Sequence, residues 1–343
     1  MLLTVESAIH NITNVPPRPQ MPIPSYERGK TTRIVLGIEN SIPRITDEGW
    51  QLQLGLQAAG YQLWGKEFGQ PYRHTDVDFI IKKADPGVIL IYDQREWDGT
   101  FRNIESMRRS DIFRVAQHKD MQHNPTFHYA SHIATMPHAW VVYYHPAICQ
   151  KFNPWMRPQH VIRTWHTVDS DKIPSWCNER TIPCLFSGAT QVNIYPFRYQ
   201  IQQWIESGAL RRVYTLPHPG YMQKGWFTDL FLKILSHTRV ALCTASKYAY
   251  TLRKFIEATA CGCRVIGNPP IDDPFPEIDE NMVRVPDDIS AEGLQRIIDR
   301  EVANYDPRRQ ELLADKAIKW YDYRVVGRRL ADRIDEVRNG WHA

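Results

Sequence analysis

Short apolar runs alternate with amphipathic segments along most of this chain, and this alternation constrains the fold more than any other feature. In the first half, the runs that predict strands lie at 33–38, 61–64, 87–92, 112–116, 140–144 and 161–165, and the segments that predict helices lie at 45–59 and 77–84. Strands and helices that alternate in this way are typical of a parallel α/β sheet.

A second α/β series follows a break in the pattern. Residues 166–181 are polar and without periodicity, which is typical of a linker between domains. Beyond it, strands are predicted at 183–186, 212–216, 240–244, 264–266 and 282–285, and helices at 196–206, 227–235, 250–260, 291–304 and, as one or two helices, 308–337. We therefore expect an α/β protein of two Rossmann-like domains that face a cleft, with C-terminal helices that pack back onto them.

These patterns also predict where the domains begin and end. The expected parts are a Pro-rich N-terminal arm at 1–30, an N-terminal Rossmann-like domain at 31–165, the linker at 166–181, and a C-terminal Rossmann-like domain with its terminal helices at 182–343.

Composition narrows the class of protein further. The 343 residues are 43% hydrophobic, yet no run approaches the ~18 apolar residues of a membrane span. The first residues, MLLTVESAIHNITNV, lack the basic start of a secretory signal, and the six cysteines form no CxxC pair. We therefore expect a cytoplasmic protein (in the host cytoplasm if phage-encoded) with buried, reduced thiols and no membrane span.

The segment at 245–266 carries the most chemistry. It is predicted to run from strand through loop and helix to a second strand, so backbone N–H groups at the helix start could bind an anion. Lys247, Arg253 and Lys254 add positive charge there, and Glu257 could accept hydrogen bonds from a ribose. From spacing alone, a surface helix with an i,i+4 bridge from Arg253 to Glu257 is an equally good interpretation.

The stretch LRKFIEATACGCRVIGNP resembles the donor site of group-1 glycosyltransferases of the GT-B fold, especially the CgeB-like branch. The likeness continues upstream in Ser187-Gly188-Ala189 and in Tyr195-Pro196-Phe197-Arg198, and it covers roughly residues 165–335. Many members of the broader family have a first Glu eight residues before the second. Ala249 stands at that position here, which puts a direct sugar contact from it in doubt.

The resemblance implies a role for each matching residue. Glu257 would hold the ribose of a nucleoside diphosphate sugar, with a UDP-sugar favoured. Arg253 would stabilise the departing diphosphate. The residues implied to bind the donor are Gly188, Arg198, Ser246, Lys247, Thr251, Leu252, Arg253, Lys254 and Glu257. The resemblance also implies that no metal or other cofactor is required and that the enzyme is retaining.

The acceptor side is expected in the first domain, at strand ends. Asp93 and Asp98 follow its strongest predicted strand, and His118 follows another. In a retaining enzyme Asp93 would bind the acceptor, whereas in an inverting enzyme Asp93 or Asp98 would be the base. Another acidic pair, Asp76 and Asp78, has metal-ligand spacing, but its place at a predicted helix start indicates a cap.

The acceptor itself stays open at this point. Arginines and aromatic residues in the first domain fit a DNA partner, such as a hydroxymethylated base in phage-type DNA, and a polysaccharide, protein or small-molecule acceptor is the alternative. An inactive GT-B module that only binds a partner is a second alternative. An NAD-type oxidoreductase is disfavoured, because no G-x-G-x-x-G follows Ile38 or Phe186.

Overall fold

The computed structural model describes residues 30–37, 48–65, 71–91, 101–118, 137–153, 156–216, 218, 226–248 and 251–341. The expected Pro-rich arm therefore lies outside the described residues, apart from Lys30. The chain divides into two compact units. Unit 1 comprises Met1–Glu39, Leu56–Thr164 and Arg328–Ala343, and unit 2 comprises Asn40–Gly55 and Trp165–Gly327.

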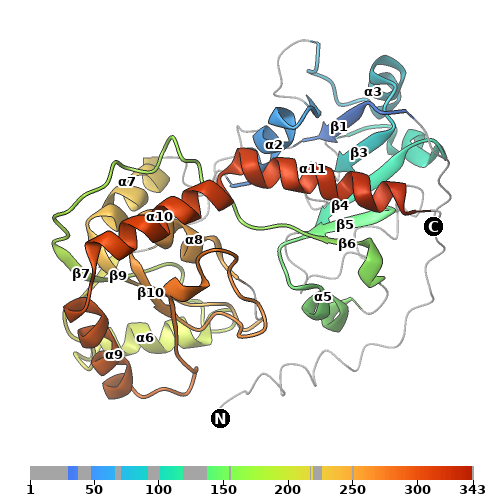
Figure 1. Ribbon diagram of the computed structural model, residues 1–343. Helices are drawn as coiled ribbons and strands as arrows, with labels where there is room; N and C mark the ends of the chain where they lie inside the picture. Colours follow the sequence, from blue (N-terminus) through green and yellow to red (C-terminus); the bar gives the residue numbers. More distant parts are fainter. Residues whose placement is uncertain are drawn as a thin grey trace. The chain divides into compact units, whose positions relative to one another are not determined.

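Unit 1 is built on a six-stranded parallel sheet with the order β2-β1-β3-β4-β5-β6 (Figure 1). Its strands are β1 (Arg33–Leu36), β2 (Gln62–Trp64), β3 (Val88–Ile91), β4 (Phe113–His118), β5 (Ala139–Val142) and β6 (Val161–Arg163). Every residue of β3, β4 and β5 is buried, as expected for strands covered on both faces. This confirms the prediction of a parallel α/β sheet from the short apolar runs.

The helical segments of unit 1 connect these strands. They are α2 (Glu48–Ala58, of which Leu56–Ala58 belong to this unit), α3 (Val77–Ala84), α5 (Pro146–Phe152) and two 3-10 turns, Ile104–Arg108 and Pro158–His160. Asp76 caps α3: its Oδ1 accepts hydrogen bonds from the N–H groups of Asp78 at 3.1 Å and Phe79 at 3.4 Å. The prediction that Asp76 is a capping residue is thus confirmed.

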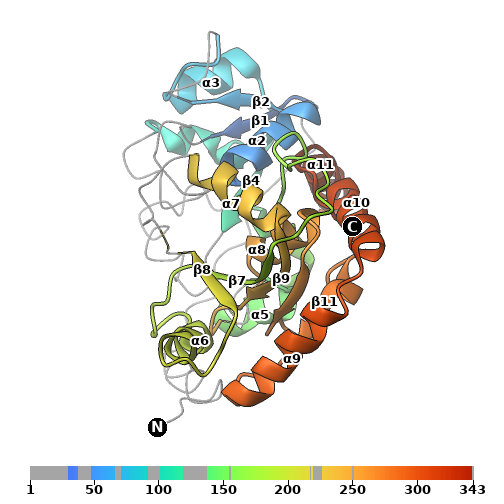
Figure 2. The ribbon, with the colours of Figure 1, turned by 90° about the vertical axis from the view of Figure 1, so that its left-hand side faces the viewer.

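Unit 2 contains a five-stranded parallel sheet with the order β11-β10-β9-β7-β8, and Figure 2 shows several of its strands side by side. The strands are β7 (Ile182–Ser187), β8 (Val213–Leu216), β9 (Thr238–Cys243), β10 (Arg264–Gly267) and β11 (Met282–Arg284). The connecting helices are α6 (Pro196–Glu206), α7 (Trp226–Ser236), α8 (Arg253–Ala260) and α9 (Ala291–Ala303), with a 3-10 turn at Asp279–Asn281. Two apolar clusters cover the sheet. One lies against α8, and the other lies under α6 and α9.

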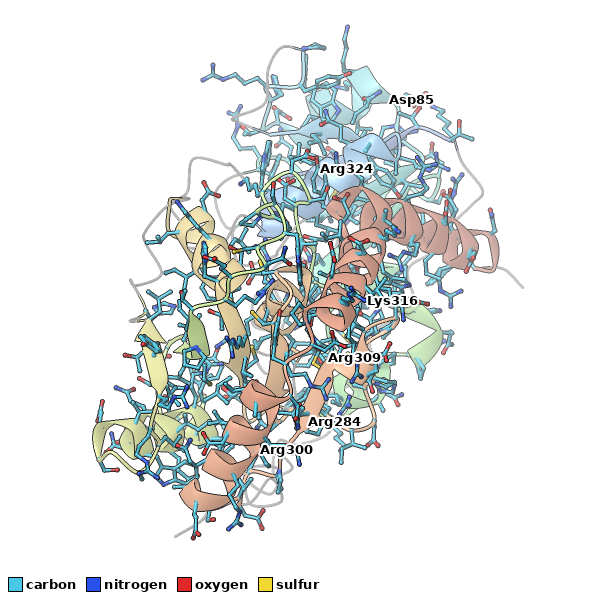
Figure 3. All side chains as sticks on the ribbon, turned by 60° about the vertical axis from the view of Figure 1, so that its left-hand side comes forward. Asp85, Arg284, Arg300, Arg309, Lys316 and Arg324 are labelled. Carbon is cyan, nitrogen blue, oxygen red and sulfur yellow. The ribbon has the colours of Figure 1, made fainter. Side chains whose placement is uncertain are left out.

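Two long helices end the chain, α10 (Pro307–Tyr321) and α11 (Tyr323–Asn339). Arg309 and Lys316 lie on α10, where Figure 3 labels them, and both pair with Glu280, at 3.6 and 3.1 Å. Where α10 meets α11, the N–H of Val168 donates to the carbonyl of Tyr321, and the N–H of Tyr323 donates to the carbonyl of Val168. Val168 lies in the expected linker. The segment at 166–181 has no helix or strand and belongs to unit 2.

The units differ from the expected domains at two places. Asn40–Gly55 belongs to unit 2, and Arg328–Ala343 belongs to unit 1, although it was expected with the C-terminal domain. Side-chain contacts explain the second difference, because Asp335 pairs with Arg33 and Arg338 Nη2 donates to the carbonyl of Lys30 at 2.9 Å. An amphipathic pattern predicts that a helix has a buried face but does not identify its packing partner.

Candidate functional site

The strand order of unit 2 predicts where a ligand binds. From β7 the chain passes to β8 on one side and then to β9 on the other, so the order reverses between β7 and β9. In open parallel sheets, ligands bind at the carboxyl ends of the strands beside such a reversal. Gly188 follows β7 there, and Thr244 follows β9.

Gly188 leaves room for two cationic side chains. Its φ of +111° lies in the region that favours glycine, and a Cβ at this position would lie 2.7 Å from Nζ of Lys254 and 3.0 Å from Nη1 of Arg198. The ammonium and the guanidinium therefore converge on the backbone at the end of β7. A larger residue would displace both of them.

Arg198 is held rigidly in this position. It lies in the first turn of α6 and is only 2% exposed. Its guanidinium donates to Thr244 Oγ1 at 2.7 Å, to the carbonyl of Thr244 at 3.0 Å and to the carbonyl of Ala189 at 2.9 Å. It also stacks on the ring of Tyr195 at 3.9 Å. These contacts fix the guanidinium at a point where it can donate to an anionic ligand.

Lys254 is the second cation of the pair. Its Nζ donates to the carbonyl of Ser187 at 2.6 Å. Burial, together with repulsion from Arg198, lowers the pKa of Lys254 to about 7. Burial and the same two cations also lower the pKa of His218, so this histidine lies near them. Sequence reasoning missed His218, because no motif surrounds it. Neighbouring buried cations of this kind favour an anionic ligand.

The i,i+4 pair from Arg253 to Glu257 is present, but it does not lie on a surface helix. The two groups are 3.0 Å apart, and their side chains are only 6% and 7% exposed. Arg253 Nη2 also donates to Gln51 Oε1 at 3.2 Å, and Gln51 accepts a second hydrogen bond from Thr167. The alternative of a solvated helix is therefore wrong about burial, although it is right about the pairing. The arginine thus holds the buried carboxylate in a fixed orientation.

The loop before α8 supplies polar groups to the same edge. Ser246 is buried, and its Oγ accepts a hydrogen bond from the N–H of Tyr248. Lys247 is exposed, with its Nζ 5.2 Å from the ring centre of Tyr248. Thr251 is buried and donates to Asp273 Oδ2 at 3.1 Å. Leu252 is the N-cap of α8, and its apolar side chain has no oxygen for the first N–H groups of that helix.

One further polar pair extends this edge of the sheet, and sequence reasoning missed it. Asn268 follows β10, accepts a hydrogen bond from the N–H of Ala245 at 2.8 Å, and donates to Asp287 at 2.6 Å. Burial raises the pKa of Asp287. Asn268 is the second-last residue of the stretch that carries the family resemblance, and only its position after a strand could have identified it.

The acceptor residues predicted in the first domain do not form a described site. Asp93 and Asp98 lie outside the described residues. His118 is the last residue of β4 rather than part of a loop after it; it is 6% exposed, and its ring lies 6.2 Å from that of Trp140. Of the basic and aromatic residues considered for a DNA partner, Arg114 and Phe113 belong to the core. Arg114 donates to the carbonyl of Met107 at 2.8 Å.

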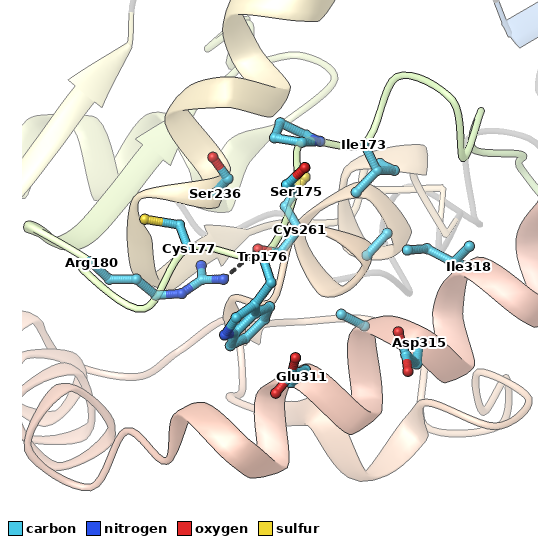
Figure 4. Close-up of a pocket in the computed structure, with 13 residues that line it drawn as sticks. Ile173, Ser175, Trp176, Cys177, Arg180, Ser236, Cys261, Glu311, Asp315 and Ile318 are labelled. Carbon is cyan, nitrogen blue, oxygen red and sulfur yellow. Dashed lines mark hydrogen bonds between the residues drawn. The ribbon is translucent and has the colours of Figure 1, made fainter.

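The small-residue turn after α8 has a structural role. Gly262 has φ +79°, and a Cβ there would lie 2.4 Å from both Arg180 and Trp176. The Arg180 guanidinium donates to the carbonyl of Cys261 at 2.9 Å and to that of Thr238 at 2.7 Å. Figure 4 shows the hollow beside it, whose volume is about 90 Å³. The turn at Gly262 therefore serves the packing of Arg180 and Trp176 within unit 2.

The cysteines are free thiols, and five of the six are buried. Burial raises the pKa of Cys243 to about 11 and that of Cys263 to about 12, so these thiols stay protonated at neutral pH. Within the part of the chain that the structure describes, no group of three or more His, Cys, Asp or Glu side chains could hold a metal ion. In the same part, no helix is both long and apolar enough to cross a membrane.

No protein-family model and no curated protein matches this chain. Solved structures do. Sucrose-phosphate synthase from Thermosynechococcus elongatus matches with a TM-score of 0.60 at 11% identity, over 90% of this chain and 100% of that one. Anabaena HepE in complex with UDP-glucose matches with a TM-score of 0.56 at 10% identity, over 89% and 100% of the two chains.

The chain has the GT-B fold. A third neighbour with this fold is an α-glucosyltransferase solved with UDP and a 13-mer DNA that contains an HMU base; it has a TM-score of 0.56 and 10% identity, over 89% of this chain and 99% of that one. The GT-B fold predicted from the resemblance is thus confirmed. The likeness to the CgeB-like branch stays a prediction, because sequence identities this low show the fold alone.

Proposed function

We propose that this GT-B chain is a glycosyltransferase that binds a nucleoside diphosphate sugar, with a UDP-sugar favoured, at the carboxyl ends of β7 and β9. One observation carries the proposal: Arg198 and Lys254 converge, buried, on Gly188 at the point where the strand order reverses. A diphosphate would neutralise both cations and accept their hydrogen bonds. Two GT-B neighbours, HepE and the α-glucosyltransferase, were solved with UDP or UDP-glucose, which supports this donor class.

The other predicted donor residues take roles around that diphosphate. The N–H groups of Thr251 and Leu252 would bind its oxygens at the start of α8. Glu257, held by Arg253, would accept hydrogen bonds from the ribose hydroxyls. Ser246 and Lys247, in the loop before α8, would line the same side of the nucleotide.

Transfer then depends on charge at the leaving group. The bond between the sugar C1 and the diphosphate oxygen breaks, a bond from C1 to the acceptor oxygen forms, and the acceptor hydroxyl loses its proton. Three cations would stabilise the charge that develops on the diphosphate: Arg198, Arg253 and Lys254. In other enzymes a metal ion has this role. We propose that the transfer needs no metal, which activity measured in EDTA would test. We also propose that the sugar keeps its anomeric configuration, which NMR of the product would test.

For the acceptor we propose a DNA base that carries a hydroxymethyl group. The support is the neighbour that was solved with DNA containing an HMU base. Asp93 would bind the acceptor hydroxyl, and Asp98 and His118 are the other candidates on the acceptor side. Polysaccharide, protein and small-molecule acceptors are the alternatives that the transfer assay must include.

The donor proposal is tested by thermal shift with a panel of nucleotides and nucleotide sugars. A saturating ligand at ~100 Kd stabilises the folded chain by about 2.7 kcal/mol, which raises Tm measurably. We expect a selective shift with UDP and UDP-sugars that Lys254→Met makes smaller. Lys319→Met, which removes an exposed lysine from α10, should leave the shift unchanged. No shift with any nucleotide would refute donor binding.

A transfer assay separates the enzyme from an inactive module. The enzyme should release UDP slowly from a UDP-sugar and faster when hydroxymethylated DNA is added. Binding without any release of UDP under either condition would favour the inactive GT-B module that only binds a partner.

A further inference from the structure

A groove with three arginines lies in unit 2, away from the candidate donor site. It has a volume of about 510 Å³ and is lined by Arg211, Arg212, Arg239, Gln295 and Asp299, with two small apolar residues of α9. The three arginines are exposed. A groove of this volume lies within the range of small-molecule sites, roughly 300–1,000 Å³.

Strand polarity separates this arginine groove from the donor site. Arg211 and Arg212 directly precede β8, and Arg239 is the second residue of β9, so all three lie at the amino ends of parallel strands. Gly188 and Thr244 follow the carboxyl ends. Five residues along β9 separate Arg239 from Thr244, which at ~3.3 Å per residue places the two edges roughly 17 Å apart. One ligand therefore does not occupy both places.

The lining of the arginine groove includes one carboxylate, that of Asp299. Among the described residues, no carboxylate forms an ion pair with Arg211, Arg212 or Arg239. The Nε of Arg239 donates to a backbone carbonyl, that of Arg180, at 3.1 Å. Asp299 lines the groove but accepts from Gln295 Nε2 at 2.9 Å, while Gln295 Oε1 accepts from the N–H of Arg211 at 2.6 Å. Gln295 thus orients the acidic group and the turn before β8.

Arg212 adds an independent observation. Its φ of +60° lies in the left-handed region that favours glycine, so the arginine side chain is present at a conformational cost. Strained residues of this kind concentrate at functional sites. The side chain of Arg212 should therefore have a use in the groove that offsets this cost.

We propose that the arginine groove is a second binding site, which holds a phosphate ester. Planar guanidinium groups bind phosphate oxygens through paired hydrogen bonds, and three of them line one groove. Asp299 and Gln295 can accept hydrogen bonds from hydroxyl groups next to that phosphate. Free sugar phosphates and the backbone of a nucleic acid both offer this chemistry. The proposal does not depend on the proposed donor site.

The decisive variant is Arg212→Gly, because it separates a ligand-binding role from a structural one. Glycine relieves the strain, so Tm should stay the same or rise by about 2 °C. Loss of charged hydrogen bonds should weaken phosphate binding at least about tenfold. Glu277→Gly is the matched control, because Glu277 also has a positive φ, +65°, and does not line the groove. This control should have the same effect on Tm and none on binding.

The experiment uses the full chain with UDP in excess, so that any donor site is filled. One arm titrates glucose 6-phosphate by calorimetry, and the other titrates a fluorescein-labelled single-stranded oligonucleotide by anisotropy at several salt concentrations. Binding in either arm that Arg212→Gly weakens supports the proposal and identifies the source of the phosphate. If UDP does not bind, the same comparison is made without it.

Three results would overturn the proposal. The first is that neither probe binds the wild-type chain. The second is equal binding by the wild-type chain and by Arg212→Gly. The third is a fall in Tm for Arg212→Gly together with unchanged binding by Arg211→Gln and Arg239→Gln, which would show that Arg212 is structural.

Discussion

Protonation of Lys254 should couple donor binding to pH. Burial and repulsion from Arg198 place the pKa of Lys254 near neutrality, at about 7, in the free protein. A bound diphosphate would restore the ammonium charge, so the apparent Kd should scale as 1 + 10^(pH − pKa). Between about pH 6.5 and about pH 8.5 this factor rises about 25-fold, or ~2 kcal/mol. Affinity should therefore fall as pH rises.

Isothermal titration with a UDP-sugar measures this effect, because its diphosphate diester does not titrate in that range. Titrations in two buffers of different ionisation enthalpy should show proton uptake that approaches one per site near about pH 8. The pH dependence should vanish in Lys254→Met and persist in Lys319→Met. A flat wild-type affinity, or the same slope in Lys254→Met, would refute the reasoning.

The same lysine should also affect the free protein. Because the pKa of Lys254 is lower in the folded state than its ordinary value of 10.5, the unfolded chain binds more protons between about pH 7 and about pH 10. Stability should consequently rise with pH there, by about 2 kcal/mol between about pH 7 and about pH 9 from this group. Urea denaturation of the wild-type chain and of Lys254→Met at both pH values isolates that contribution.

Four further perturbations test other parts of the account. Glu257→Gln should lower the free energy of unfolding by about 2 kcal/mol and weaken UDP binding at least about tenfold, in denaturation and titration experiments respectively. Gly188→Ala should weaken UDP binding by more than about tenfold, because its Cβ meets Lys254, whereas Gly208→Ala, with φ +77° and nothing within 4 Å, should lose only stability. Asp76→Ala should cost about 1 kcal/mol of stability, measured in urea, since α3 loses its cap. Burial alone would raise the pKa of Asp322, but hydrogen bonds from Arg324 and Ser170 hold it at about 2. The stability that this carboxylate contributes should therefore fall as pH drops from about 4 to about 2. Acid denaturation of Asp322→Asn should lack that part of the pH dependence.

Much of the fold could be predicted from the sequence, because the signals are local. Apolar runs of four to six residues identified strands such as β3 and β9, and Pro196 marked the start of α6. Strand polarity and helix connections then left few topologies. The assignment of the last helix was not predictable in this way. The contacts of Asp335 and Arg338 with the start of unit 1 span some 300 residues, and no local pattern encodes them.

In the candidate site, too, the local features were predictable from the sequence and the long-range contacts were not. The motif around Arg253 and Glu257 was visible as spacing, but its burial was not, because Gln51 covers Arg253 from a segment about 200 residues earlier. The lowered pKa of Lys254 arises from burial and from repulsion by Arg198 on another helix. His218 had no sequence signal, since its role comes only from the two cations near it. Spacing therefore identified the residue types, and the fold determines their charge states.

The most direct test of the central claim is the Kd of UDP measured by isothermal titration at about pH 6.5 in EDTA. It should be compared between the wild-type chain and the double variant Arg198→Gln, Lys254→Gln. We predict binding by the wild-type chain and a Kd at least about 100-fold higher in the double variant, because two charged hydrogen-bond donors to the diphosphate are lost. Equal affinity of the two proteins, or no binding of UDP by the wild-type chain, would contradict the donor site at the ends of β7 and β9.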